Sequence, residues 1–87
     1  MRRVKDPDST TYFTIDWSVD LGTDTISLSD WSIETGITEE DASFTDTTAT
    51  IWVSGGTLGT EYLLTNRIVT AGGMTLDKTF PIIVGYK

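Results

Sequence analysis

Apolar and polar positions alternate along most of this chain. A first alternating set covers residues 13–19, and similar sets cover 49–53, 62–68 and 74–84. A period of two is typical of strands that bury one face and expose the other. Thr, Val, Ile and aromatic residues, which favour strands, supply much of the pattern. The sequence therefore predicts an all-β protein.

One segment departs from simple alternation. Ile26 and Leu28 share one parity, whereas Trp31 and Ile33 share the other. Because an inserted residue changes which face the following side chains occupy, a bulge near Ser29–Asp30 would turn all four inward. We expect one strand with that bulge.

The middle of the chain is acidic. Residues 39–41 are consecutive acids and predict a solvated loop, leading to a short edge segment at 43–45 that Phe44 anchors. Residues 38–42 are the most helix-like stretch, but they lack an apolar face, so we expect at most one helical turn.

The segment from Gly59 to Gly73 indicates the type of fold. Tyr62 follows a Gly-containing turn at the start of the penultimate strand, where a tyrosine corner occurs in immunoglobulin domains. Immunoglobulin domains have a disulfide between their two sheets and a tryptophan packed against it. Here Leu64, two residues after Tyr62, takes the place of one cysteine, and Ile15 or Trp17 takes the place of the other. Trp31 takes the place of the core tryptophan. We predict an immunoglobulin-like two-sheet β-sandwich of six or seven antiparallel strands over residues 11–87, with a barrel as the alternative that the turn spacing leaves open. Truncating Trp31 should cost about 3 to 5 kcal/mol.

Composition limits the chemistry. The 87 residues include no Cys and no His, which removes disulfides, thiolate metal sites and the commonest general base. The net charge is −7, and Arg2, Arg3 and Lys5 lie in an opening basic arm over residues 1–10. Because nucleic-acid binding needs clustered cations, we expect no nucleic-acid partner. We also expect no membrane span and no signal peptide, because no long apolar run occurs.

No catalytic constellation is apparent, and we predict no enzyme activity, metal or cofactor. Adjacent acids on an extended chain point to alternate faces, so residues 39–41 do not form an acid–base pair. Trp52 opposes the inward parity of its strand, and Arg67 faces outward on the penultimate strand. Exposed aromatic and arginine side chains anchor many interfaces, so both are candidate contacts. A Trp52 shielded by neighbouring side chains is an equal alternative.

Several segments, in their order and spacing, resemble a family of small bacteriophage structural proteins called phage fiber-tail adaptor proteins. They are Lys5–Asp8, Asp16–Ser18, Asp24–Ile26, Ser43–Thr47, Trp52–Thr57, Gly59–Tyr62, Thr65–Ile68 and Thr70–Gly73. The resemblance implies a noncatalytic virion or prophage component of the tail or head-tail region, present in the host cytoplasm before assembly. It implies other phage structural proteins as partners, and self-assembly in the particle is a further option.

The tentative interface residues are Arg2, Arg3, Lys5, Trp52 and Arg67. A basic arm on an acidic body could reach a neighbouring acidic subunit, although a solvated tail is the commoner outcome. The alternative function is a surface β-sandwich that binds a glycan or calcium through the loop acids and Trp52.

Overall fold

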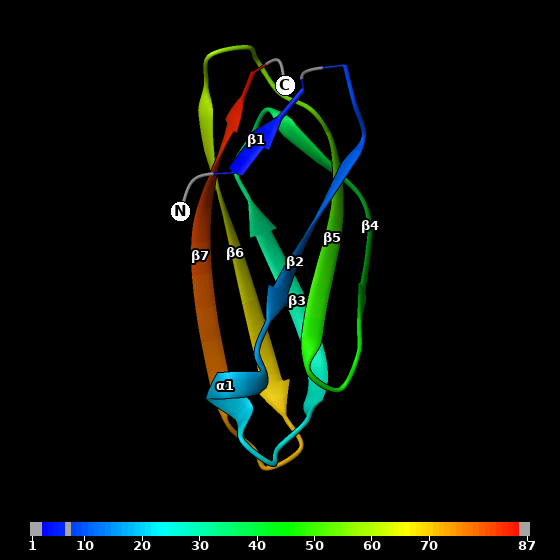
Figure 1. Ribbon diagram of the computed structural model, residues 1–87, viewed down its shortest axis with the longest axis vertical. Helices are drawn as coiled ribbons and strands as arrows, with labels where there is room; N and C mark the ends of the chain where they lie inside the picture. The colour runs from blue at the N-terminus through cyan, green and yellow to red at the C-terminus, as the bar shows by residue number, and fades with distance from the viewer. Residues whose placement is uncertain (1–2, 7, 86–87) are drawn as a thin grey trace.

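The computed structural model describes residues 3–6 and 8–85, which form two packed β-sheets (Figure 1). One sheet has the strand order β1-β7-β6-β3, and the other has the order β2-β5-β4. A helical turn, α1 (Ser18–Leu21), closes one end. The strands are β1 (Arg3–Lys5), β2 (Thr11–Asp16), β3 (Ile26–Ile33), β4 (Ile37–Phe44), β5 (Thr48–Gly55), β6 (Glu61–Thr70) and β7 (Thr75–Val84).

This strand order is the one that defines the immunoglobulin fold. In that fold one sheet contains strands B, E and D, and the other contains C, F and G. Here β2-β5-β4 and β3-β6-β7 match these two sets in chain order. The predicted all-β sandwich is confirmed, with seven strands among the described residues.

One pairing differs from the expectation of antiparallel strands throughout. β1 runs parallel to β7, with Arg3 opposite Ile82 and Lys5 opposite Val84. β7 offers this free edge just beyond Pro81, which cannot donate a backbone hydrogen bond. Residues 3–5 are therefore part of a sheet, whereas we had placed them in a separate arm.

The core between the sheets consists of two adjoining clusters, and Trp31 and Phe80 pack against both. Trp31 is only half-buried, and its ring meets Phe80 edge-on with 6.1 Å between centroids. Leu64 is fully buried. One cluster contains Phe13, Ile37, Ile51, Val53, Tyr62, Leu64, Ile82 and Val84, and the other contains Ile15, Trp17, Leu21, Ile26, Ala49 and Ile68.

The first predicted strand ends earlier than its alternation indicates. The Asp16 carboxylate accepts the N–H of Ser18 at 2.9 Å, which satisfies a backbone donor of the following turn. The chain then enters α1, so Val19 is 94% exposed and does not continue the apolar face. Trp17, at the junction, is 1% exposed. It is the fully buried tryptophan of the fold, a position that we had assigned to Trp31.

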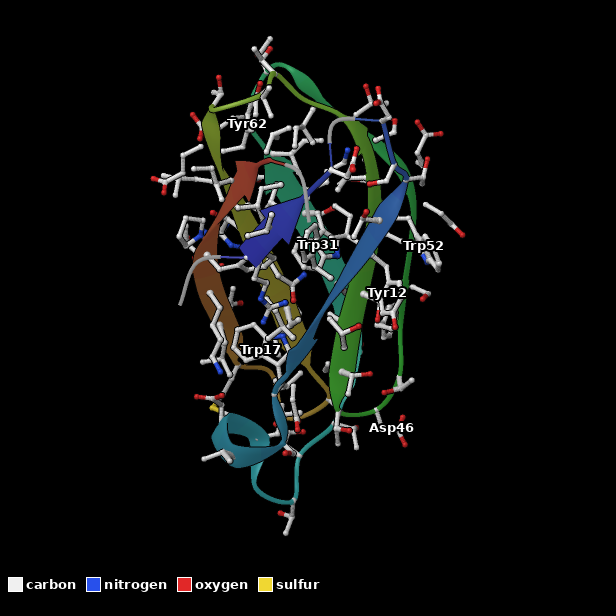
Figure 2. The ribbon with its side chains drawn as sticks, turned by 45° about the horizontal axis from the view of Figure 1, so that its top comes forward. Tyr12, Trp17, Trp31, Asp46, Trp52 and Tyr62 are labelled. Atoms are coloured by element: carbon white, nitrogen blue, oxygen red, sulfur yellow. The ribbon has the colours of Figure 1, made fainter. Side chains whose placement is uncertain are left out.

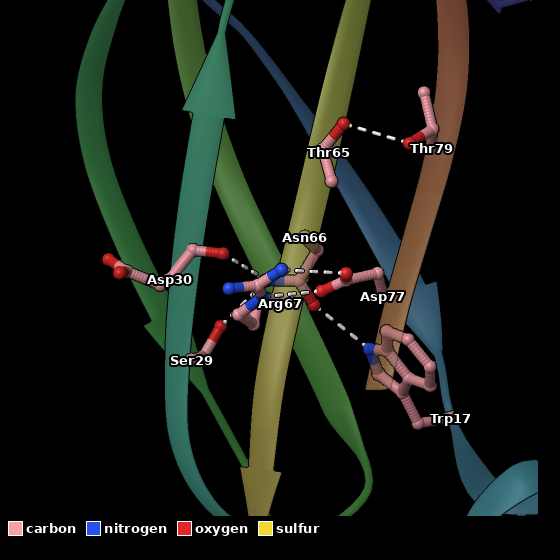
Figure 3. Close-up of polar contacts among 8 residues, drawn as sticks. All are labelled: Trp17, Ser29, Asp30, Thr65, Asn66, Arg67, Asp77 and Thr79. Carbon is pink, nitrogen blue, oxygen red and sulfur yellow. Dashed lines mark hydrogen bonds and ion pairs between the residues drawn. The ribbon is translucent and has the colours of Figure 1, made fainter. Parts of the chain in front are cut away.

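A buried amide fixes Trp17 in place (Figure 3). Asn66 on β6 is fully buried, and its Oδ1 accepts the Trp17 indole N–H at 2.9 Å. Its Nδ2 donates to the Ser29 hydroxyl and to the Asp30 carbonyl oxygen, each at 2.9 Å. One side chain thus links β6 both to β3 and to the segment that follows β2.

The same network explains where the β3 bulge lies. The register shifts between Ile26 and Leu28, and not near Ser29–Asp30 as predicted. Ser29 can then face inward to bond Asn66, while Leu28 turns outward and is 56% exposed. Trp31 and Ile33 share the parity of Ser29, so this register also turns both of them toward the core.

Residues 39–41 belong to β4 and do not form the predicted loop or helical turn. β4 is an edge strand that pairs only with β5, and its register shifts between Glu39 and Asp41. Phe44 at its end is exposed and not an anchor. Charged residues and bulges on an edge strand prevent further strands from adding, so acids are tolerated in this strand.

The loop between β5 and β6 carries the bond that defines a tyrosine corner. The Tyr62 hydroxyl accepts the backbone N–H of Thr57, five residues upstream, at 2.9 Å. Gly36, at φ +111°, lies against the ring, because a Cβ there would be 3.0 Å from Tyr62 Cε1. Hydrogen bonds from Thr57 lower the pKa of the Tyr62 hydroxyl. The corner therefore joins the two sheets at one end.

Candidate interaction surface

Two aromatic rings lie side by side on the outer face of the β2-β5-β4 sheet (Figure 2). Tyr12 on β2 and Trp52 on β5 are directly opposite in the strand register. Their ring centroids are 4.9 Å apart and their planes are tilted by 43°. Tyr12 is 56% exposed and Trp52 is 39% exposed. Trp52 is thus partly shielded by Tyr12 and partly open to solvent.

Polar side chains surround the pair. Asp41 on β4 is directly opposite Trp52, so Tyr12, Trp52 and Asp41 form one row across three strands. The nearby Glu40 carboxylate accepts the hydroxyl of Ser54. The hydroxyls of Thr14 and Thr50 share a hydrogen bond at 2.9 Å in the next row. We call this surface the aromatic face, made of Tyr12, Thr14, Glu40, Asp41, Thr50 and Trp52.

The two sheets differ in charge. The strands of the β2-β5-β4 sheet contain four carboxylates and no Lys or Arg. The strands of the other sheet contain four Lys or Arg and three carboxylates. The aromatic face therefore lies on the acidic side of the sandwich. The acids of the first sheet are Asp16, Glu39, Glu40 and Asp41.

Arg3 and Lys5, two of the predicted basic contacts, are held within the domain. The Arg3 guanidinium lies 4.6 Å from the Phe80 ring centroid and donates to the Thr14 carbonyl oxygen at 3.2 Å. It joins β1 to β2 across the gap between the sheets. Arg2 lies outside the described residues.

Lys5 is fully buried and is not a surface contact, contrary to our expectation. Its Nζ donates to the carbonyl oxygens of Asp6 and Gly55, each at 2.8 Å. Burial lowers the pKa of Lys5, and the charges of Asp6 and Asp8 oppose that shift. The side chain ties β1 to the end of β5, which explains why it points inward despite its charge.

Arg67 faces outward on the opposite sheet, as predicted, but it is engaged (Figure 3). Its Nε and Nη2 donate to the two carboxylate oxygens of Asp77 at 2.8 and 3.0 Å. This bidentate pair raises the pKa of Arg67 and lowers that of Asp77. Lys78, which follows Asp77 on β7, pairs with Asp20 at 2.6 Å, and its Nζ lies 4.7 Å from the Trp17 ring centroid.

Over residues 3–6 and 8–85 we find no pocket and no group of three or more acidic side chains placed to hold a metal ion. In the same part of the chain no helix is long and apolar enough to cross a membrane. Trp52 was predicted as a contact from the sequence, whereas Tyr12 and Asp41 were not. Their positions opposite Trp52 depend on strand pairing, which the parity of a single strand does not reveal.

The strand order and the tyrosine corner define a small immunoglobulin-type β-sandwich domain. The family described as podophage GP4 fiber-tail adaptor protein gp77 matches residues 5–83, and the chain belongs to this family. It is therefore a phage structural protein and a component of the virion. No curated protein matches the chain.

Proposed function

We propose that this protein is a noncatalytic interaction module of the phage tail or head-tail region, which binds other structural proteins of the same particle. The observation that carries the proposal is the exposed Tyr12–Trp52 pair on the outer face of a sheet. Large, rigid aromatic side chains lose little conformational entropy when a partner covers them and dominate binding hot spots. The family match supports the same class of function.

The geometry favours a face as the contact over a strand edge. The edge strand β4 carries Glu39, Glu40 and Asp41 and a register shift, which disfavours the addition of another strand. Contact through the aromatic face needs no free edge, because its side chains project from three strands that are already paired. We therefore place the candidate contact at Trp52, with Tyr12 as the side chain that orients it. Arg67, paired with Asp77, is a weaker candidate.

The experiment is co-purification of the full chain with each structural protein encoded beside it, followed by size-exclusion chromatography. We expect a stable complex with at least one tail or head-tail protein, assembled first in the host cytoplasm and retained in the virion. Absence of association with any of them would reject an interaction role. Chromatography of the chain alone tests self-assembly in the same experiment.

We do not propose the calcium alternative, because within the described residues the acids are not gathered into a metal site. A glycan role has no independent observation of its own. It is kept as a competing outcome of the binding experiment below.

A further inference from the structure

We propose that the aromatic face recognises an arginine-bearing, basic segment on a different structural protein of the particle. This inference rests on the proposed interaction role and specifies the chemistry of the partner. The argument combines the charge of the sheet, the row formed by Tyr12, Trp52 and Asp41, and the state of the chain's own cations.

The charge of the face selects a cationic partner. The β2-β5-β4 strands have four carboxylates and no basic residue. Asp41 accepts the N–H of its neighbour Ala42 at 2.9 Å, and Glu40 accepts the Ser54 hydroxyl. These are bonds to neutral donors, so both carboxylates keep their negative charge available to a cation. An acidic partner would be repelled.

The row across the strands fits a guanidinium. Trp52 presents an aromatic surface, and Asp41 lies directly opposite it in the register. Side chains in that relation have Cβ atoms about 4.5–5.5 Å apart. A planar guanidinium stacked on the indole could therefore reach the carboxylate with its edge donors, a combination that an ammonium group cannot match. Tyr12 supports the far side of the indole.

The protein already places cations over aromatic rings internally. Lys78 lies 4.7 Å from the Trp17 ring centroid and pairs with Asp20 at 2.6 Å. Arg3 lies 4.6 Å from the Phe80 ring centroid. In both cases a cation covers an aromatic ring at the edge of the core. Trp52 and Asp41 offer the same two partners to an outside cation.

The observations favour a different protein over a second copy of this chain. Arg3, Lys5, Arg67 and Lys78 are the cations that the structure describes, and each is engaged within its own domain. A second copy would also bring its own net charge of −7. Two copies of this acidic chain repel each other, most strongly at low salt, which disfavours contact between them. The occupant is therefore a basic segment of another protein.

The test uses a synthetic extended peptide of alternating Arg and Thr, with matching Lys–Thr and Glu–Thr peptides, added to the full chain. The indole N–H signal of Trp52 in a correlation NMR spectrum reports binding at that residue alone. We expect the Arg peptide to shift this signal and to bind about fivefold more tightly than the Lys peptide. The affinity should fall as salt is raised, and the Glu peptide should not bind.

Matched variants assign the contact. Asp41→Asn should weaken binding of the Arg peptide about fivefold, because it removes the carboxylate of an exposed charge pair. Asp30→Asn removes the same charge from the opposite sheet and should leave binding unchanged. Melting temperatures confirm that both variants are folded. The inference is overturned if the Arg and Glu peptides bind equally, if Trp52 does not respond, or if the two variants behave alike.

Two further results separate this inference from the proposed function. If a tail protein binds the chain but Asp41→Asn and Asp30→Asn bind it equally, the interaction role stands and the arginine site is wrong. If a soluble glucose hexasaccharide shifts the Trp52 signal and the Arg peptide does not, the face is a sugar platform and the inference is rejected. Failure of every tail protein to associate counts against the interaction role itself.

Discussion

The buried amide of Asn66 provides the sharpest test of how this sandwich is held together. Replacing Asn66 by Ala leaves the Trp17 indole N–H and the Asp30 carbonyl oxygen without the bonds that they make at 2.9 Å. The Ser29 hydroxyl oxygen loses only an accepted bond from Asn66 Nδ2 and its own O–H can still donate, so the other two groups carry most of the cost. Asn66 is fully buried, so solvent does not reach these groups directly.

Each buried polar group left without a partner costs about 1–3 kcal/mol, and a water entering the vacated space recovers part of this, so we expect a loss of about 2–4 kcal/mol. A domain of 87 residues has a free energy of unfolding of about 4–13 kcal/mol. Asn66→Ala should therefore remain folded but melt roughly 10–30 °C lower.

The assay is thermal unfolding followed by circular dichroism, together with urea titration. Thr65→Val, at the residue next to Asn66, is the matched control. It removes an exposed hydrogen bond between the hydroxyls of Thr65 and Thr79 and leaves no buried polar group unpaired. Its melting temperature should stay near that of the parent. A double-mutant cycle with Trp17→Phe should give a coupling of about 1 kcal/mol. If Asn66→Ala and Thr65→Val have the same melting temperature, the Asn66 network does not stabilise the fold.

Three further predictions use the same assays. Trp17→Ala should cost about 3–5 kcal/mol and exceed the loss from Trp31→Ala, because Trp17 is buried and Trp31 only half-buried; equal losses would contradict this assignment. Tyr62→Phe should lower the melting temperature more than Tyr12→Phe, because only the Tyr62 hydroxyl bonds the Thr57 N–H, and no difference would reject the corner. Hydrogen bonds from Thr70, Thr25 and Gly72 lower the pKa of Asp24, so its contribution to stability is present above the ordinary carboxyl pKa and is lost as pH falls through the lowered value. Asp24→Asn should flatten the acid limb of a plot of melting temperature against pH, and an unchanged limb would exclude Asp24 as a contributor.

The sandwich could be predicted from the sequence because most strands bury one face. Residues 49–53 and 62–68 alternate clearly, and both lie in strands with one buried face. The tyrosine corner was readable for a similar reason, since Tyr62 follows a Gly-containing turn at the start of its strand. Local patterns that depend on neighbours along the chain were therefore informative.

The predictions that the structure contradicts have a different origin. Trp17 and Val19 continue an alternating pattern, but the Asp16 carboxylate accepts the N–H of Ser18 and the helical turn α1 follows, so the strand ends at Asp16. The β3 bulge places Ser29 against Asn66, which is 37 residues away in the chain. The consecutive acids of β4 predicted a loop, but an edge strand exposes most of its side chains and therefore tolerates charge. Each depends on a contact or a position that only the assembled sheets create.

The candidate surface shows the same division. Trp52 could be found from the parity of its own strand, whereas Tyr12 and Asp41 are its neighbours only through strand pairing. Lys5 was misplaced because charge predicts exposure, while two carbonyl oxygens satisfy its ammonium group inside the domain. Its burial could not be anticipated without the position of Gly55.

The central claim is that Trp52 and its face bind another structural protein of the particle. The most direct measurement is the affinity of the full chain for a co-purifying tail protein, compared between Trp52→Ala and Leu63→Ala, which removes an exposed apolar side chain from the opposite sheet. We predict that Trp52→Ala weakens binding about tenfold or more, as a hot-spot aromatic does, while Leu63→Ala binds like the parent. Equal affinity for the parent and Trp52→Ala, with both folded, would contradict the account.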